Sequence, residues 1–265
     1  MAKDDAARYD QLIAEIFRRH YKKGVTRFEF DREEIEDVAS AIDVKLPKNL
    51  GDVLYSYRFR KSLPASILAT EPTGNSWRIK LAGQARYLFQ LGGSDRIEPR
   101  SNQHRIKIPD ATPEIVGHYA LTDEQALLAK VRYNRLVDVF LGIAAYSLQN
   151  HLRTTVRGIG QIEVDEIYVG VDRHGGQFVV PVQAKSGKDK LGCVQAEQDV
   201  ACCAEKFPHL TCRPVAVQFL DSDGIAMFEL TLNANGEIKV VEERHYQLVA
   251  ASEITEGDLA SYRKP

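Results

Sequence analysis

Two adjacent strand-like segments between Gln161 and Lys185 constrain this chain more than any other feature. Residues 162–171 are rich in valine, isoleucine and tyrosine, and a turn containing two glycines separates them from a mostly apolar segment at 178–184. Side chains alternate between the two faces of a strand, so polar residues two positions apart share a side. If the segments pair in the matching register, four polar side chains converge: Glu163, Asp165, Gln183 and Lys185.

This set of side chains suits a hard divalent cation. Carboxylate and carbonyl oxygens are the ligands that Mg²⁺ prefers, and Mn²⁺ accepts similar ligands. We therefore expect Mg²⁺, with Mn²⁺ as the alternative ion, at a site whose ligands are Asp165, Glu163 and Gln183. Lys185 beside such an ion would position a water molecule or stabilise developing negative charge.

The pattern of these residues resembles the PD-(D/E)XK nuclease superfamily, which has the restriction-endonuclease-like fold. An acid–x–Asp strand is followed, after a Gly-bearing turn, by a (Glu/Gln)–x–Lys strand. The resemblance implies that Asp165 binds the metal and that Lys185 is the motif lysine. Gln183 stands where the family usually has glutamate, and Glu163 is the candidate to supply the missing charge. The implied activity is metal-dependent hydrolysis of DNA phosphodiester bonds by a restriction- or defence-type endonuclease.

The remainder of residues 111–265 agrees with an α/β/α catalytic domain. We expect a long helix from Asp123 to about Leu148, with a break near Gly142. A second helix at 193–206 and strands at 214–220, 225–232 and 239–249 complete the order. Some families of this superfamily draw an extra acid from the first helix, which suggests Glu124 or Asp138. The alternative is a first-turn helix-dipole partner at Glu124 and a solvated residue at Asp138.

Residues 1–110 predict a winged helix–turn–helix domain followed by a basic linker. The expected helices cover 6–21, a segment capped by Asp31, and 47–60, and the expected strands cover 28–30, 66–70, 77–81 and 83–91. In a winged helix the third helix enters the major groove of DNA. On that basis the expected DNA contacts of this helix are Lys48, Asn49, Arg58 and Arg60.

Charge and a second resemblance point to the same role for this domain. The chain carries a net charge of only −2, but residues 55–108 contain ten basic and three acidic side chains. The segments LPKNLGDVLYSYRFRKSLP and GQARYLFQL resemble the N-terminal DNA-binding region of some uncharacterised bacterial restriction-type endonucleases. The alternative is a small α+β domain that binds protein, in which the aromatic residues form a core.

Further polar residues near the two strands are candidates for contact with DNA. Arg153, together with His151, precedes the first acidic strand and could meet a phosphate; both residues could equally be structural. Lys188 and Lys190 lie in a polar loop after the lysine strand. Gln195 and Gln198 follow on the next predicted helix, either near the site or as exposed helix residues.

The remaining sequence features exclude several classes of protein. Four cysteines between Cys193 and Cys212 do not have the spacing of a zinc site, so we favour buried thiols over zinc binding with His209. No segment has the length of apolar sequence that a membrane span needs, and the N-terminus has no signal-peptide core, so we expect a cytoplasmic protein with no membrane partner.

The expected partner is double-stranded DNA, and cutting both strands would favour a homodimer. Because Gln183 is neutral, the alternative is a catalytically inactive DNA-binding protein with a nuclease fold, acting as a regulator or assembly factor. A further alternative is a structural or protein-interaction module.

Overall fold

The structure is a computed structural model, and it divides into two compact units. Residues 1–95, with 155–162 and 192–194, cluster in the first unit, and the rest of the chain clusters in the second. Each unit has its own hydrophobic core. The described residues are 3–46, 50–59, 61–93, 96–119, 124–186, 191–220 and 224–263.

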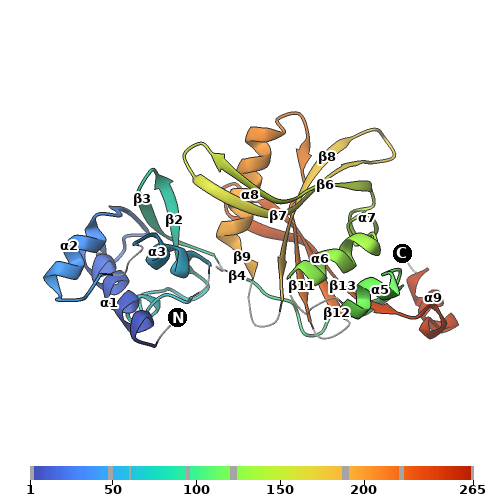
Figure 1. The fold of residues 1–265 in the computed structure, drawn as a ribbon, viewed down its shortest axis with the longest axis horizontal. Coiled ribbons are helices and arrows are strands. Elements are labelled where there is room, and N and C mark those ends of the chain that lie inside the picture. The colour runs from blue at the N-terminus through green and yellow to red at the C-terminus, as the bar shows by residue number, and fades with distance from the viewer. Residues whose placement is uncertain are drawn as a thin grey trace. The chain divides into compact units, whose positions relative to one another are not determined.

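The first unit combines four helices with a three-stranded antiparallel sheet (Figure 1). Its strands follow the order β1-β3-β2, so the central strand is the last of the three in the sequence. The predicted helix at 6–21 and the predicted strands at 28–30, 77–81 and 83–91 are confirmed. The elements are α1 (Lys3–His20), β1 (Arg27–Asp31), α2 (Glu34–Ala41), α3 (Leu50–Phe59), α4 (Ala65–Leu68), β2 (Ser76–Gly83) and β3 (Arg86–Gly92).

An aromatic cluster fills the core of the first unit. Phe17 of α1 makes edge contacts with Trp77 of β2 and Phe89 of β3, at ring-centroid distances of 5.1 and 5.2 Å. Such edge-to-face pairs add to the free energy gained by burying the rings. Most aromatic residues of this unit therefore form its core, as the alternative of a small α+β domain assumes, whereas Tyr55 is exposed.

Two details of the first unit differ from prediction. The predicted strand at 66–70 is a short helix, α4, because Pro64 provides an extended N-cap and Ile67 packs into the core. Asp31 does not cap α2: it ends strand β1, and the helix begins at Glu34 after Glu33, with no side-chain cap.

The second unit is built on an eight-stranded mixed sheet with helices (Figure 1). Helix α8 (Cys193–Lys206) has the bounds predicted from the sequence. The remaining elements are β4 (Arg96–Ile97), β5 (Arg105–Pro109), α5 (Glu114–Tyr119), α6 (Glu124–Tyr133), α7 (Leu136–Leu141), β6 (Ala144–Val156), β7 (Gly160–Val171), β8 (Gln177–Lys185), β9 (Leu191–Gly192), α8 (Cys193–Lys206), β10 (Thr211–Cys212), β11 (Val215–Phe219), β12 (Gly224–Leu232), β13 (Ile238–Val249), a 3₁₀ turn (Ala251–Glu253) and α9 (Glu256–Tyr262).

The sheet order places the two predicted site strands side by side. It runs β5-β13-β12-β11-β8-β7-β6, with short β10 also paired to β8. Strands β7 and β8 are antiparallel, and β8 and β11 are parallel, which requires a crossover through helix α8. β5, which the sequence assigns to the linker, pairs in parallel with β13.

The prediction of one long helix at 123–148 is wrong, because the described part of this range forms two helices and the start of a strand. The helix breaks at Arg135, which takes a left-handed φ of 50°, and helix α7 ends at Gly142 with φ 66°. The break predicted near Gly142 is therefore correct, and glycine tolerates this helix-ending conformation well. From Ala144 onward the chain is strand β6, where β-branched Thr154, Thr155 and Val156 favour an extended backbone.

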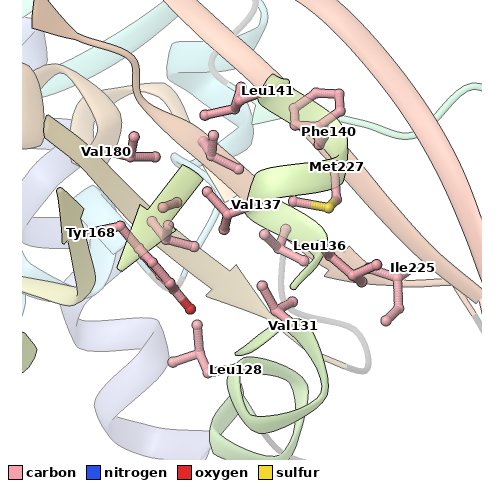
Figure 2. Packing of buried hydrophobic residues seen from close by; sticks show 14 of the residues in the cluster. Leu128, Val131, Leu136, Val137, Phe140, Leu141, Tyr168, Val180, Ile225 and Met227 are labelled. Atoms are coloured by element: carbon pink, nitrogen blue, oxygen red, sulfur yellow. The ribbon is translucent and has the colours of Figure 1, made fainter. Parts of the chain in front are cut away.

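Helices α6 and α7 cover one face of the sheet. Side chains at alternate positions of β8 (Val180, Val182 and Ala184) belong to the same buried cluster as these helices. Figure 2 shows helix and strand residues of this cluster packed together: Leu128, Val131, Leu136, Val137, Phe140, Leu141, Tyr168, Val180, Ile225 and Met227. The intervening β8 residues, Gln183 among them, face the opposite side.

A buried acid on β13 ties residue 100 to the sheet. Glu243 is 5 % exposed and accepts hydrogen bonds from the backbone and guanidinium of Arg100, at 2.8 and 2.6 Å. His245 Nε2 lies 2.8 Å from its carboxylate. Burial acts to raise the pKa of Glu243, but the Arg100 and His245 contacts outweigh it and hold the pKa below its ordinary value.

In the described part of the chain, none of the helices combines the length and the apolar character that a membrane span requires.

We predict that Glu243→Gln lowers the free energy of unfolding at neutral pH by about 1 to 3 kcal/mol, because Arg100 loses a charged partner. Since the folded-state pKa of Glu243 is depressed, its stabilisation is present above the ordinary value of 4.5 and is lost as pH falls through the lowered pKa. Urea denaturation across pH measures this. Glu242→Gln, in a more exposed ion pair, is the control and should change little.

Candidate functional site

The β7–β8 hairpin has the pairing that brings the predicted residues together. Its register runs from Glu166↔Val182 to Val171↔Gln177. The turn is closed by Asp172, whose carboxylate accepts the backbone N–H groups of residues 174 and 176, each at 2.8 Å. Gly175 takes φ 83°, a conformation that costs glycine little. The turn therefore sets the position of every side chain further along both strands.

Asp165 is bonded directly to the partner strand. Its Oδ2 accepts the backbone N–H of Ala184 at 2.9 Å. Burial raises the pKa of Asp165, while this hydrogen bond and the positive charge of Lys185 act in the opposite direction. The carboxylate is thus fixed in place and desolvated, as a metal ligand or a catalytic acid needs to be.

Gln183 is buried beside Asp165 and has an oxygen with no partner. The residue is 4 % exposed, and its Nε2 lies 3.4 Å from the backbone oxygen of Glu163. Its Oε1 is buried and receives no hydrogen bond in the described structure. A buried carbonyl oxygen without a donor is costly, so this atom is a candidate ligand for a missing group.

A second buried acid, Asp199 of helix α8, reaches the same place. It is 2 % exposed, and its Oδ1 is also buried with no partner among the described residues. Burial raises the pKa of Asp199 well above the ordinary value, and the charge of Asp165 adds to this, whereas a hydrogen bond from Gln183 opposes it. Helix α8 therefore supplies an acid to the face of the sheet that carries Gln183.

Lys185 is paired with an acid from helix α6. Its Nζ lies 2.9 Å from Glu124 Oε1, and the lysine side chain is only 17 % exposed. Of the two predicted extra acids, Glu124 and Asp138, it is Glu124 that lies at the site. Asp138 instead ion-pairs with Arg135 and accepts the backbone N–H of Ala145, which joins α7 to β6.

Glu163 is engaged by the edge strand β6. Its carboxylate lies 3.2 Å from His151 Nδ1 and 3.1 Å from Arg153 Nε. Burial acts to raise its pKa, but Arg153 and His151 outweigh this and lower it. The structure therefore joins the predicted phosphate contacts His151 and Arg153 to the predicted second acid.

Glu166, which follows Asp165 in the sequence, points to the opposite face of β7. Glu166 is fully buried, accepts Arg132 Nε of α6 at 2.9 Å, and bonds to the hydroxyl of Ser147. Successive strand residues face opposite sides, so Asp165 and Glu166 face different layers of helices.

The predicted DNA contacts are only partly described. Arg58 is half-buried, and burial lowers its pKa to about 10, so its guanidinium packs within the first unit. Arg153 is exposed and paired to Glu163. The remaining predicted contacts lie outside the described residues: Lys48, Asn49, Arg60, Lys188 and Lys190.

The cysteines agree with the thiol interpretation. Cys193, Cys202 and Cys203 are buried, Cys212 is half-buried, and none is in a disulfide. Across the described ranges, no group of three or more histidine, cysteine, aspartate or glutamate side chains is arranged to hold a metal ion. A site formed by two carboxylates and an amide oxygen is not a group of this kind.

Asp199 is not among the residues predicted from the sequence, which include its neighbour Gln198 on the same helix. Its signal was an acid on the apolar stripe of α8, three residues after Ala196 and four before Cys203, both buried. Charged residues are rarely fully buried without a purpose or partner.

Comparison of the chain with protein-family models, curated proteins and solved structures finds no match.

We predict that Gln183→Glu destabilises the metal-free protein by about 1 to 3 kcal/mol, because it buries another carboxylate beside Asp165 and Asp199. Urea denaturation in the presence of a chelator measures the effect. Gln177→Glu, at the exposed start of the same strand, is the matched control and should change stability by less than about 0.5 kcal/mol. Equal stability of the two variants would contradict the proximity of the three side chains.

Proposed function

We propose that this protein is a Mg²⁺-dependent DNA endonuclease of the PD-(D/E)XK type. The observation that carries the proposal is the meeting of Asp165, Gln183 and Lys185 across two paired strands, beside a helix acid. Asp165 is electrostatically coupled to Lys185, as the resemblance requires of a metal-binding aspartate and the motif lysine.

The topology of the second unit supports this proposal. Helices α6 and α7 precede three consecutive strands, β6 to β8, which lie side by side, and α8 leads to β11, which is parallel to β8. This agrees with the α/β/α order that the resemblance implies, with the acid and lysine strands adjacent in the sheet.

The first unit supports binding to DNA. After α1 and β1 come α2, α3 and the short α4, and then the antiparallel pair β2–β3, an order that resembles a winged helix–turn–helix domain. In this proposal α3 faces the major groove. Residues 55–95 of this unit carry six basic and two acidic side chains, and this charge would supply phosphate attraction.

The oxygen donors fit a hard cation. Asp165 would hold Mg²⁺ through its carboxylate, and Gln183 through the buried Oε1 that has no other partner in the described structure. Bound there, the cation would polarise a phosphate oxygen and lower the pKa of a coordinated water. Glu163 could join only by leaving His151 and Arg153.

Lys185 has a separate role in this proposal. Its ammonium would turn from Glu124 toward the attacking water and the phosphate, where it would stabilise negative charge as it develops. The water oxygen attacks phosphorus and gives up a proton, while the bond to the leaving oxygen breaks and that oxygen gains a proton. Glu124 would hold Lys185 ready when no DNA is bound.

The second candidate function is a DNA-binding protein with an inactive nuclease fold. Two observations favour it: Gln183 is neutral, and Lys185 is bound to Glu124. Cleavage assays separate the two candidates.

We predict that the wild-type chain cuts duplex DNA in Mg²⁺ or Mn²⁺, and that Asp165→Asn and Lys185→Ala each reduce cutting at least about 100-fold. Asparagine keeps an acceptor for the Ala184 N–H, so Asp165→Asn should remain folded. The controls are Asp172→Asn in the hairpin turn and Lys206→Ala at the end of α8, and both should cut normally. Tight DNA binding without cutting of any substrate, modified or unmodified, would favour the inactive alternative.

We also predict that duplex binding weakens steeply as salt rises, because each phosphate contact releases counterions. Band-shift titrations at several salt concentrations measure the slope. A chain that fails to bind duplex at low salt would contradict the proposal and favour a protein-interaction module.

A further inference from the structure

The proposed metal site lacks one carboxylate. Mg²⁺ usually takes one or two carboxylates, with water and substrate phosphate completing its six oxygen ligands. Gln183 contributes no charge, Glu163 is held by His151 and Arg153, and Glu124 is held by Lys185. Asp165 alone would leave the site with a single negative charge and correspondingly weak affinity.

Asp199 is placed to supply the missing charge. It comes from helix α8, which covers the face of the sheet toward which Gln183 points. Asp199 lies near enough to Gln183, Asp165 and Lys185 for all three side chains to influence its carboxyl group. No other acid on α8 is buried within the described residues: Glu197 is half-buried and Glu205 is exposed.

Two buried oxygens at this place have no donor. Asp199 Oδ1 and Gln183 Oε1 each lack a hydrogen-bond partner in the described structure, although both residues are more than nine-tenths buried. When Asp199 is ionised, both atoms are acceptors, so neither can satisfy the other. A cation satisfies several acceptor oxygens at once, and buried charges in proteins are normally paired or bound to metals.

We infer that Asp199 is the second carboxylate ligand of the divalent cation, which lies between it, Asp165 and Gln183. This inference rests on the proposed function for the position of Asp165. It assigns to helix α8 the negative charge that the lysine strand lacks.

The same arrangement gives a reason for glutamine at position 183. Its amide nitrogen can donate to Asp199 while its carbonyl oxygen remains free for the ion. A glutamate there would add a further carboxylate in one desolvated cluster, and like charges at short range repel strongly. In this chain the neutral residue on the strand and the acid on the helix compensate one another.

Mn²⁺ binding to the full-length protein tests the inference. Electron paramagnetic resonance measures free Mn²⁺ during titration of the wild type and of the variants Asp199→Asn, Glu163→Gln and Asp172→Asn. We expect Asp199→Asn to weaken binding by about tenfold or more and Glu163→Gln to weaken it less. The turn variant Asp172→Asn keeps an Oδ1 that can accept both turn N–H groups, so it should bind Mn²⁺ as the wild type does. Wild-type affinity in Asp199→Asn, or a greater loss in Glu163→Gln, would overturn the inference.

A second measurement needs no variant. Crystals of the wild-type protein soaked in Mn²⁺ would show an anomalous peak in contact with both Asp165 and Asp199. A peak that Asp199 does not contact, or no peak in this cluster, would overturn the inference even if Asp199→Asn failed to fold.

These results separate this inference from the proposed function. Mn²⁺ held by Asp165 and Asp199 in a protein that cuts no DNA would support the ligand assignment and contradict the nuclease proposal. DNA cutting that needs Asp165 and Lys185, with Mn²⁺ affinity unchanged by Asp199→Asn, would support the nuclease and overturn the assignment.

Discussion

The hydrogen bond from the Ala184 backbone to Asp165 is the contact on which the site depends. It ties a carboxylate of β7 to the backbone of β8, between the residues that carry the amide and the ammonium. A hydrogen bond from a backbone N–H to an ionised carboxylate is shorter and stronger than a hydrogen bond between two neutral groups. The Asp165 side chain can therefore keep its position while its pKa is raised by burial.

Around that bond, each layer of the second unit contributes one kind of group. The sheet provides the aspartate, amide and lysine, α6 provides Glu124 as the partner of the lysine, and α8 provides Asp199. Parts of the chain far apart in sequence thus share one electrostatic cluster. Its oxygens are under-satisfied and its charges desolvated, which is how proteins prepare sites that bind ions or stabilise transition states.

Local patterns were sufficient to predict the hairpin, helix α8 and most strands, because apolar periodicity and turn residues act over short distances. The bounds of α8 and the pairing of β7 with β8 are the best examples. The helix predicted to reach 148 failed, since Arg135 adopts a left-handed backbone that no local propensity favours. Asp199 and the Lys185–Glu124 pair depend on how helices pack against the sheet, which a single sequence does not encode locally.

The adjacent acids Asp165 and Glu166 give β7 a further property. Each faces a different helical layer, and each has a cation within reach: Lys185 on one side and Arg132 on the other. A one-residue slip of β7 would turn each acid to the opposite layer, and in one direction it would put Glu166 where Asp165 now lies, near Lys185. A carboxylate would then still meet a cation, so charge alone does not define the alignment, and the Asp172 turn contributes to it. A change of turn length in that direction would exchange a short acid for a long one at the site.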